Sequence, residues 1–278
     1  MVLERRTLAG RQVIGGFVGT CALMSLFACA VNDKRQVQSS VDDLSGPQLN
    51  GRRMPEKTLS LTFDDGPGER TAELSSFLRD EGISATFFVQ GNNAERRPEV
   101  LEQLSADGHL VSNHSYSHPR MTKSVDPVDE VQRTDALIER FVDRGHFVFR
   151  APYGDWSPRV ASILNEAGLT KYVGSVFWDI GGQRIQSSDG SLSAAADWAC
   201  WAYNDSIDRC LSGYLSEIRS FKKGIVLLHD IHGRTVDLTK KMVRQLRKEG
   251  YGFVRVDDVP SVAEALEKRT TLVSAQSL

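Results

Sequence analysis

The chain has 278 residues, of which 40% are hydrophobic and 25% are charged, and its formal net charge is -2 at pH 7. These values fit a globular protein large enough for one well-buried core, and they exclude fibrous, disordered and membrane-embedded classes. Because the body of the chain carries no long run of Lys or Arg, we expect no nucleic acid as a partner, and a neutral or mixed-charge ligand fits better.

The N-terminus has the pattern of an export signal. Three arginines, the last of them Arg11, precede an apolar run over residues 13–30, which predicts a signal peptide at 1–28. A transmembrane anchor is the alternative, but the run is short for a span and no cluster of positive charge follows it. Residues 26–29 resemble a bacterial lipobox, in which Cys29 would be lipidated and tether the protein to a membrane. We therefore expect a periplasmic or cell-envelope protein, with secretion as the alternative.

Beyond the signal, residues 29–55 are polar and lack periodicity, which indicates a tether. A folded domain is predicted over 56–270, with a tail at 271–278. In its first predicted strand, apolar and polar residues alternate from Leu59, and the strand ends at the pair Asp64-Asp65. Further strands are predicted at 83–89, 109–113, 147–149, 170–177, 225–228 and 251–256, and helices at 71–82, 98–107, 127–144, 158–167, 235–249 and 261–268.

The alternation of strands and helices predicts an α/β fold. The strands are apolar enough to be covered on both faces, which favours a parallel sheet, either open or closed into a barrel. In such folds the reactive groups gather at the carboxyl ends of the strands. The residues that follow each strand are therefore the candidates for chemistry.

Carboxylates and imidazoles follow two of these strands. Asp64-Asp65 is in isolation a polar turn, because Asp, Gly and Pro all favour turns. His114 and His118, after the strand at 109–113, would face the same way on one helical turn and could meet one divalent ion. Together with Asp65 they form a set of two imidazoles and one carboxylate, which leaves positions open for water and substrate and indicates a catalytic metal site.

Two further charged side chains follow later strands. Arg150 ends the strand at 147–149, where it is either a surface residue or the partner that holds a carboxylate ionised. His229 ends the strand at 225–228 and is either a polar cap or, because of its titration range, a proton donor at the same edge of the sheet.

Cys200 and Cys210 form a close pair in the folded part. In an exported chain such a pair is a disulfide candidate. Two buried thiols are the alternative, and a zinc knuckle is less favoured because no pair of histidines flanks them.

Four segments together resemble a known family. Residues 62–67, 114–118, 150–154 and 227–229 are similar, in this order, to four motifs of the polysaccharide deacetylases, carbohydrate esterase family 4, and the likeness spans about 57–256. The resemblance implies a distorted (β/α) barrel with about seven parallel strands. It also implies metal-dependent hydrolysis of N-acetyl or O-acetyl groups on sugars.

The resemblance assigns the metal and substrate contacts by position. It implies that Asp65, His114 and His118 bind a divalent metal, most often Zn²⁺, with Co²⁺, Ni²⁺ or Mn²⁺ as alternatives. Leu227 would line the pocket for the acetyl methyl group, and Pro152 is expected among the substrate contacts.

The resemblance also assigns the catalytic roles. Asp64 would be the general base, and Arg150 would orient it. The backbone N–H of Tyr153 would bind the oxyanion, and His229 would be the general acid. The chemistry is consistent with these roles, because a base, an acid and a stabilised oxyanion are what amide hydrolysis needs.

The chain departs from the family where a compact Asp-x-x-x-Trp motif is expected after the fifth strand. Asp179 stands there without a close Trp, and an insertion follows at about 180–213. We expect Asp179 to support His229. Trp198 or Trp201 would return to form a groove wall that stacks on sugar, the alternative being a local core stapled by the two cysteines.

The sequence thus predicts a deacetylase of an N-acetylglucosamine polymer. Export and near-neutral charge favour peptidoglycan, ahead of chitin-type oligosaccharides or an exopolysaccharide. A metal-dependent O-acetyl esterase acting on xylan is an alternative within the family. A carbohydrate-binding domain without catalysis is the alternative from another class.

Overall fold

The computed structural model describes residues 48–276, and the side chains among them as far as residue 269. The predicted signal peptide, most of the predicted tether and Cys29 lie outside the described residues. Within the described part, no helix combines the length and the apolar character that crossing a bilayer requires.

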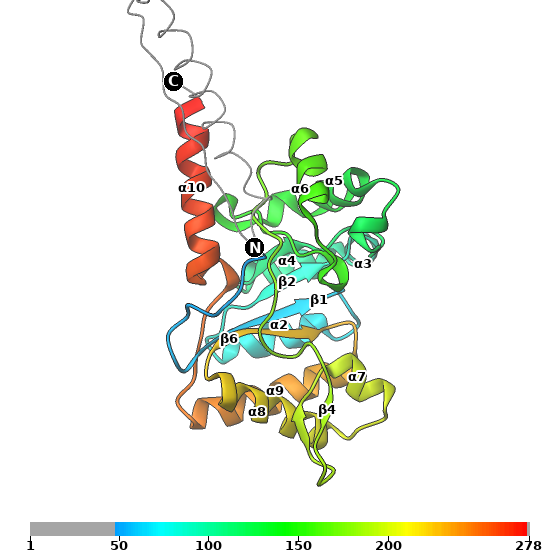
Figure 1. The fold of residues 1–278 in the computed structure, drawn as a ribbon, viewed down its shortest axis with the longest axis vertical. Coiled ribbons are helices and arrows are strands. Elements are labelled where there is room, and N and C mark those ends of the chain that lie inside the picture. Colours follow the sequence, from blue (N-terminus) through cyan, green and yellow to red (C-terminus); the bar gives the residue numbers. More distant parts are fainter. Residues whose placement is uncertain (1–47, 277–278) are drawn as a thin grey trace, which may run out of the picture. The chain divides into compact units, whose positions relative to one another are not determined.

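A parallel sheet carries the residues that the sequence singled out. Its strands run in the order β3-β2-β1-β6, and a short strand β7 also pairs with β1. The strands are β1 (Thr58–Asp64), β2 (Thr86–Val89), β3 (Leu110–Asn113), β6 (Gly224–His229) and β7 (Gly252–Phe253) (Figure 1). The register places Asp64 directly beside His229. The predicted base and the predicted acid therefore leave neighbouring strands at the same edge.

Single backbone bridges continue this sheet around a ring. Asn113 of β3 pairs with Phe149, Val148 pairs with Val173, and Ile180 pairs back with Val226 of β6, all in parallel. The strands predicted at 147–149 and 170–177 thus lie at their expected places in the order, but they pair only through Val148, Phe149, Val173 and Val176 rather than by a regular ladder, and residues 170–171 form a turn. The predicted α/β fold is confirmed, and the ring is the distorted barrel.

The predicted tether ends earlier than residue 55. Leu49 pairs in parallel with Val176, and its backbone exchanges hydrogen bonds with the 175–177 segment. Met54 is buried in the core. Residues 49–54 therefore belong to the folded domain, because a few apolar side chains within a polar stretch suffice to dock it.

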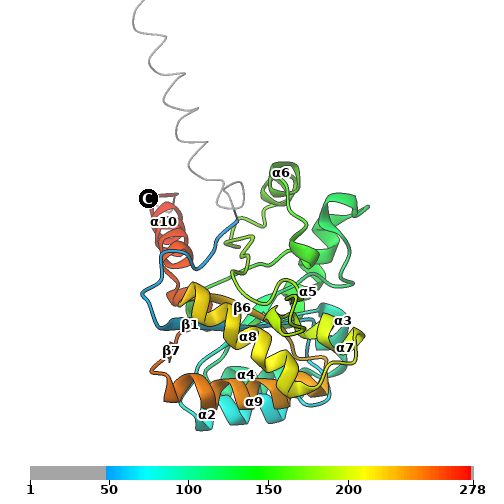
Figure 2. The same ribbon diagram turned by 60° about the horizontal axis from the view of Figure 1, so that its bottom comes forward.

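Helices surround the sheet, and their bounds are as follows: α2 (Thr71–Asp80), α3 (Gly91–Arg96), α4 (Pro98–Ala106), α5 (Pro127–Ile138), α6 (Pro158–Glu166), α7 (Asp197–Ala202), α8 (Ile207–Phe221), α9 (Gly233–Lys248) and α10 (Pro260–Gln276). Helices α8 and α9 lie side by side along the sheet (Figure 2). Short 3-10 helices cover Met121–Lys123, Glu139–Phe141, Asp143–Gly145, Pro152–Gly154 and Val256–Asp258.

All six predicted helices are found, and a glycine with positive φ lies just past the end of four of them, α2, α4, α6 and α9. Gly108 after α4 and Gly168 after α6 have φ of 82° and 81°, a left-handed conformation that glycine adopts without strain. The helices α3, α7 and α8 were not predicted. The last two, with the hairpin of β4 (Ile185–Gln186) and β5 (Leu192–Ala194), belong to the region around the insertion.

The alternation along β1 separates a helix-facing side from a polar interior. Leu59, Leu61 and Phe63 join the core cluster that includes residues of α2, α4 and α9, whereas Ser60 and Thr62 are buried but lie outside the apolar clusters. Because successive side chains point to opposite faces, Asp64 shares the face of Ser60 and Thr62. The polar side of this strand thus leads directly to a buried carboxylate.

Candidate active site

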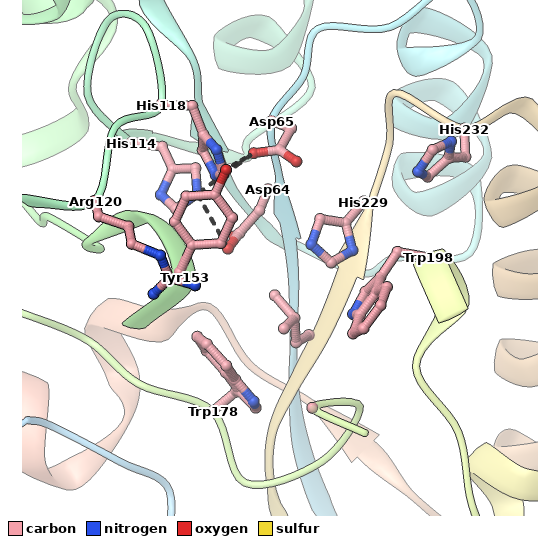
Figure 3. Close-up of a pocket in the computed structure, with 12 residues that line it drawn as sticks. Asp64, Asp65, His114, His118, Arg120, Tyr153, Trp178, Trp198, His229 and His232 are labelled. Atoms are coloured by element: carbon pink, nitrogen blue, oxygen red, sulfur yellow. Dashed lines mark ion pairs between the residues drawn. The ribbon is translucent and has the colours of Figure 1, made fainter. Parts of the chain in front are cut away.

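A cavity of about 580 Å³ opens at the carboxyl ends of the strands (Figure 3). Its lining combines carboxylates, imidazoles and aromatic rings, which suits a polar substrate with an apolar face. The lining residues are Asp64, Asp65, His114, His118, Arg120, Tyr153, Trp178, Gly182, Trp198, Leu227, His229 and His232.

One side of the cavity holds a cluster that fits a metal ion. Ligand atoms of Asp65, His114 and His118 all lie within 4.8 Å of one another. Oδ1 of Asp65 is 3.1 Å from Nε2 of His118 and 3.5 Å from Nε2 of His114. This oxygen is buried and accepts no hydrogen bond within the described chain. A buried carboxylate oxygen without a donor, facing two imidazole nitrogens, fits the donor set of a divalent ion.

Electrostatics keep the carboxylate of Asp65 ionised. Burial acts to raise the pKa of Asp65, but the imidazoles of His118, His114 and His229 outweigh it and hold that pKa well below its ordinary value. Burial lowers the pKa of His114, which favours its neutral form. An ionised carboxylate and a neutral imidazole are the protonation states that a metal ligand needs.

The two histidines converge by a loop rather than by a helix. The prediction that His114 and His118 share a helical turn is wrong, because residues 114–118 have no helical assignment and both Ser115 and His118 have φ of 63°. The carboxylate of Glu130 accepts hydrogen bonds from the backbone N–H groups of Tyr116 and Ser117. Glu130 of α5 therefore holds this loop in place of helical hydrogen bonds. The centroids of the two imidazole rings still lie 5.1 Å apart.

A backbone carbonyl orients the buried imidazole of His114. Its Nδ1 lies 2.8 Å from the carbonyl oxygen of Arg150. Because a carbonyl only accepts, the proton sits on Nδ1 and the lone pair on Nε2 faces Asp65.

The predicted pair of Asp64 and Arg150 is present. Nη1 of the fully buried Arg150 lies 2.7 Å from Oδ1 of Asp64 and 2.8 Å from Oγ1 of Thr62. The same guanidinium donates from Nε to the carbonyl of Val176. The second oxygen of Asp64 lies 3.6 Å from Nε2 of His114. One carboxylate oxygen is thus held by a cation, and the other faces the metal cluster.

On the opposite side, the partner of His229 is Asp197, and the expectation for Asp179 is wrong. Oδ1 of Asp197 lies 2.8 Å from Nδ1 of His229, and its Oδ2 accepts from the backbone N–H of His229 at 2.8 Å and from Oγ1 of Thr235 at 2.7 Å. Burial acts to lower the pKa of His229, but the Asp197 carboxylate outweighs it and raises the pKa to about 9. The imidazole is therefore poised to hold a proton.

Asp179 instead organises the start of β6. Its Oδ2 accepts hydrogen bonds from the backbone N–H of Gly51 at 2.7 Å and of Ile225 at 2.9 Å. His229 lies four residues further along the strand, about 13 Å at the usual rise per residue. The side chain is therefore at the wrong end of β6 to reach the imidazole.

The missed signal was present in the sequence. Asp197 and Trp201 have the Asp-x-x-x-Trp spacing, but they stand towards the end of the insertion rather than directly after the fifth strand. Nε1 of Trp201 donates to Oγ1 of Thr235, the hydroxyl that in turn donates to Asp197. Trp201 therefore supports the acid instead of forming a groove wall, whereas Trp198 lines the cavity and is half-exposed.

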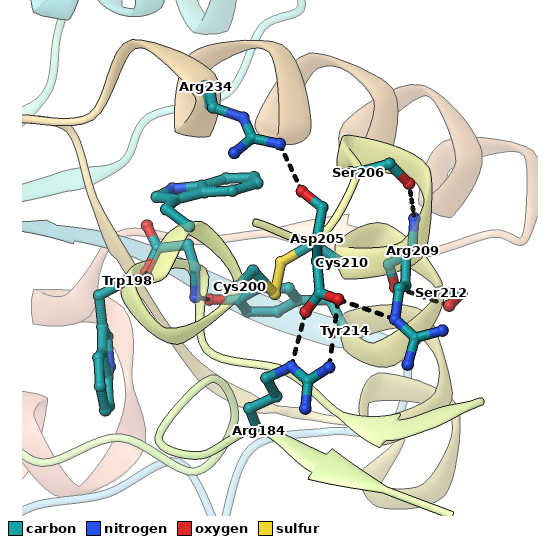
Figure 4. The surroundings of a disulfide bond; sticks show 12 residues. Arg184, Trp198, Cys200, Asp205, Ser206, Arg209, Cys210, Ser212, Tyr214 and Arg234 are labelled. Atoms are coloured by element: carbon teal, nitrogen blue, oxygen red, sulfur yellow. Dashed lines mark hydrogen bonds and ion pairs between the residues drawn. A yellow bond between two sulfur atoms is a disulfide. The ribbon is translucent and has the colours of Figure 1, made fainter. Parts of the chain in front are cut away.

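The insertion is anchored by the predicted disulfide. Cys200 of α7 and Cys210 of α8 are bonded, with their Cα atoms 5.9 Å apart (Figure 4). The hydroxyl of Tyr214, also on α8, accepts from the backbone N–H of Asp197 and donates to the carbonyl of Leu227, both at 3.0 Å. Tyr214 therefore links the partner of His229 to strand β6.

Of the other predicted substrate contacts, some line the cavity and one does not. Leu227 and Tyr153 line the cavity, and Tyr153 has a left-handed φ of 59°. Pro152 is buried in the turn before it and is not among the lining residues, so the expected substrate contact is not found. The lining residues Arg120, Trp178, Gly182 and His232 were not predicted. No spacing rule marks them, because they reach the cavity from loops.

A second buried carboxyl, that of Asp230, directly follows His229 in the chain. Asp230 accepts a hydrogen bond from Oγ1 of Thr71, while its Oδ1 has no partner among the described residues, and burial raises its pKa to about 7. A Cβ on Gly66 would lie 2.0 Å from Oδ2 of Asp230. Glycine is therefore required directly after Asp65 to make room for this carboxyl.

The chain is similar to known deacetylases in sequence. A family model described as polysaccharide deacetylase matches residues 51–172. The peptidoglycan-N-acetylglucosamine deacetylase of Bacillus cereus is 30% identical over 214 residues, which cover 74% of this chain and 71% of that protein. The chitin deacetylase of Colletotrichum lindemuthianum is 28% identical over 210 residues, which cover 72% of this chain and 78% of that protein.

Solved structures agree in fold. A crystal structure of a peptidoglycan N-acetylglucosamine deacetylase matches with a TM-score of 0.60 at 24% identity, covering 76% of this chain and 91% of that one. Structural neighbours of this kind are distorted (β/α)7 barrels. From the sequence matches and the shared barrel we conclude that the chain belongs to the polysaccharide deacetylase family, family 4 of the carbohydrate esterases.

Proposed function

We propose that this chain is a metal-dependent hydrolase that removes N-acetyl groups from a polysaccharide containing N-acetylglucosamine. One observation carries the proposal: a single cavity joins the Asp65 cluster, the Asp64–Arg150 pair and the His229–Asp197 pair. Amide hydrolysis requires a general base, a general acid and, in metal-dependent enzymes, a site for a Lewis acid, and this cavity offers candidates for all three.

Asp65, His114 and His118 would hold the metal, and their geometry fits one. Two imidazoles and one carboxylate favour Zn²⁺, with Co²⁺, Ni²⁺ or Mn²⁺ as alternatives. When bound, a divalent ion supplies Lewis acidity, which polarises the acetyl carbonyl and acidifies the attacking water.

Asp64 is the general base in this proposal. Its free oxygen faces the metal cluster, where it would accept the proton of the attacking water. The buried guanidinium of Arg150 holds the other oxygen and keeps the carboxylate charged and in one orientation. Asp64 and Asp65 therefore have different roles although they are adjacent, because β1 ends between them and Asp65 turns to a φ of 72°.

His229 is the general acid. Because Nδ1 is bonded to Asp197, the proton available to the cavity is that on Nε2. That proton would pass to the nitrogen of the departing amine, and the Asp197 carboxylate stabilises the charged imidazole before transfer. The backbone N–H of Tyr153 would bind the oxyanion, and Leu227 would contact the acetyl methyl group.

Peptidoglycan is the proposed substrate. It is supported by the relative from Bacillus cereus that is named for this substrate and by the export pattern at 1–28. Chitooligosaccharides are the second candidate because a chitin deacetylase is also similar. An exopolysaccharide, or an O-acetyl ester of xylan, would use the same site.

The protein is proposed to act outside the cytoplasm. The disulfide between Cys200 and Cys210 supports this location, because disulfides persist in oxidising compartments. Lipidation at Cys29 would tether it to a membrane. Cell fractionation of wild type and Cys29→Ala tests this tether. If Cys29 is lipidated, we expect the variant to move into the soluble fraction.

The activity is tested by acetate release from purified peptidoglycan and from chitin oligomers, with and without a chelator. We expect release that stops on chelation and returns with Zn²⁺. No release from any of these glycans, with metal demonstrably bound, would favour a carbohydrate-binding domain without catalysis.

A further inference from the structure

Arg120 is a cavity-lining residue that the proposed reaction does not use. It is the one lysine or arginine in the described lining of the cavity. Its guanidinium carbon lies 4.7 Å from the ring centroid of Tyr153, and Figure 3 shows it beside that ring, on the side of the metal cluster. An arginine that borders a catalytic cavity has a position from which it can contact the substrate.

Ring contacts fix its position relative to the chemistry. The ring of Tyr153 lies 4.5 Å from the ring of His118, centroid to centroid. The guanidinium of Arg120 and the metal ligand His118 are therefore both in contact with the one intervening ring. A substituent on the sugar that carries the acetyl group, or on the next sugar, would lie at this range.

The charge of Arg120 is not neutralised by the protein. Within residues 48–276 its side chain has neither an ion pair nor a hydrogen bond. The carboxylate of Asp155, two residues after Tyr153, accepts hydrogen bonds from the backbone N–H and the hydroxyl of Thr122. In the cavity itself, Asp64 is paired with Arg150 and Asp65 with the histidines. A cation thus faces the cavity without a partner.

A neutral acetylated glycan offers this cation only uncharged acceptors, namely hydroxyl, ring and acetamide carbonyl oxygens. A carboxylate on the glycan would offer a charge-assisted and often bidentate contact, which is roughly twice as strong as a neutral hydrogen bond. The contact with the ring of Tyr153 holds the guanidinium beside the cavity.

We propose that Arg120 forms an anion subsite, so that the preferred substrate is an acetylated glycan bearing a carboxylate on or next to the sugar that is deacetylated. This inference rests on the proposed deacetylase function and makes it more specific. It distinguishes carboxylated glycans of the peptidoglycan type from neutral glycans of the chitin type.

The test compares matched substrates and matched variants. The substrates are a soluble muramyl-containing glycan fragment, the same fragment with its carboxylates amidated, and a neutral chitin tetramer. The variants are Arg120→Gln, which removes the charge, and Arg120→Lys, which keeps it. Arg133→Gln is the control, because Arg133 also stacks on a tyrosine, Tyr116, but does not line the cavity.

We expect Arg120→Gln to lower kcat/KM for the carboxylated fragment by about threefold to tenfold, mainly through KM, as for a partly exposed charged contact. Activity on the amidated fragment and on the chitin tetramer should stay unchanged, and Arg120→Lys should recover part of the loss. High salt should weaken wild type on the carboxylated fragment but not Arg120→Gln.

Equal losses on all three substrates, or no loss on any, would overturn the subsite. Failure of the wild type to release acetate from every substrate would instead overturn the deacetylase function. The two failures are therefore distinguishable in one experiment.

Discussion

The two sides of the cavity are built in different ways. The metal side comes from strand ends and the short loops that follow them, with Asp64 at the end of β1, Asp65 directly after it and His114 after β3. The acid side needs an insertion, because His229 at the end of β6 is completed by Asp197 from α7. The barrel fixes the first side directly, whereas the second depends on how well the insertion is anchored. The two sides should therefore respond separately to mutation.

The largest effect is expected on the metal side, where adjacent carboxylates have different roles. Asp64→Asn should lower kcat by about 10²–10⁴-fold, the usual range for loss of a general base, while metal affinity changes little. Asp65→Asn should lose metal affinity, because Asp65 supplies the proposed carboxylate ligand. Calorimetric titration with Zn²⁺ and initial rates measure the two effects. An equal loss of metal in both variants would contradict the division of roles.

Breaking the disulfide should affect the acid side alone. The double variant Cys200→Ser and Cys210→Ser should lose roughly 2–3 kcal/mol of unfolding free energy, as expected for a loop of about ten residues. Its kcat should fall because α7 carries Asp197, and its affinity for Zn²⁺ should match wild type. Denaturant unfolding, rates and calorimetry together test this, and weakened metal binding would show that the two sides are coupled.

Gly66→Ala is the corresponding change on the metal side. The added Cβ would collide with the buried carboxyl of Asp230, and overpacking of this kind costs about 1–3 kcal/mol. Because Gly66 follows Asp65 directly, affinity for Zn²⁺ should fall with stability. Gly82→Ala is a control, since that position is left-handed but open. Unchanged metal affinity in Gly66→Ala would mean that the turn does not position the ligand.

The smallest effect is expected from Tyr214→Phe. This change removes the hydroxyl that bridges the N–H of Asp197 and the carbonyl of Leu227. Leaving these buried groups unpaired lowers the free energy of unfolding by about 1–3 kcal/mol. We expect a modest fall in kcat with KM for the metal-loaded enzyme unchanged. A rise in KM alone would place Tyr214 in substrate binding instead.

The sequence predicted the metal side better than the acid side, and the reason is physical. Asp65 and His114 directly follow strands whose ends must meet at one edge, so their motifs carry their own geometry. The helical turn expected for His118 was wrong because Glu130 stabilises a loop through non-local hydrogen bonds. Asp197 could be found only by recognising that it and Trp201 have the Asp-x-x-x-Trp spacing within the insertion.

Positions such as Arg120 and Asp230 could not be predicted from spacing. Arg120 reaches the cavity from a loop by stacking on Tyr153, and Asp230 is buried because Gly66 leaves space for it. Both depend on three-dimensional contacts between segments far apart in the chain. The alternation along β1, in contrast, already indicated which side of the strand carries Asp64.

The most direct test of the two-sided account is the titration of His229. Its folded pKa of about 9 lies above the ordinary 6.5, so its pairing with Asp197 stabilises the fold fully below about pH 6.5 and is lost as pH rises through about 9. In the metal-free protein, NMR titration of the imidazole should give a midpoint near pH 9. Asp179→Asn should leave that midpoint unchanged.

Asp197→Asn should move the midpoint well down, because burial then acts without the carboxylate, and the variant should still bind Zn²⁺ with the affinity of wild type. A midpoint that stays near pH 9 in Asp197→Asn, or one that falls in Asp179→Asn, would contradict the account.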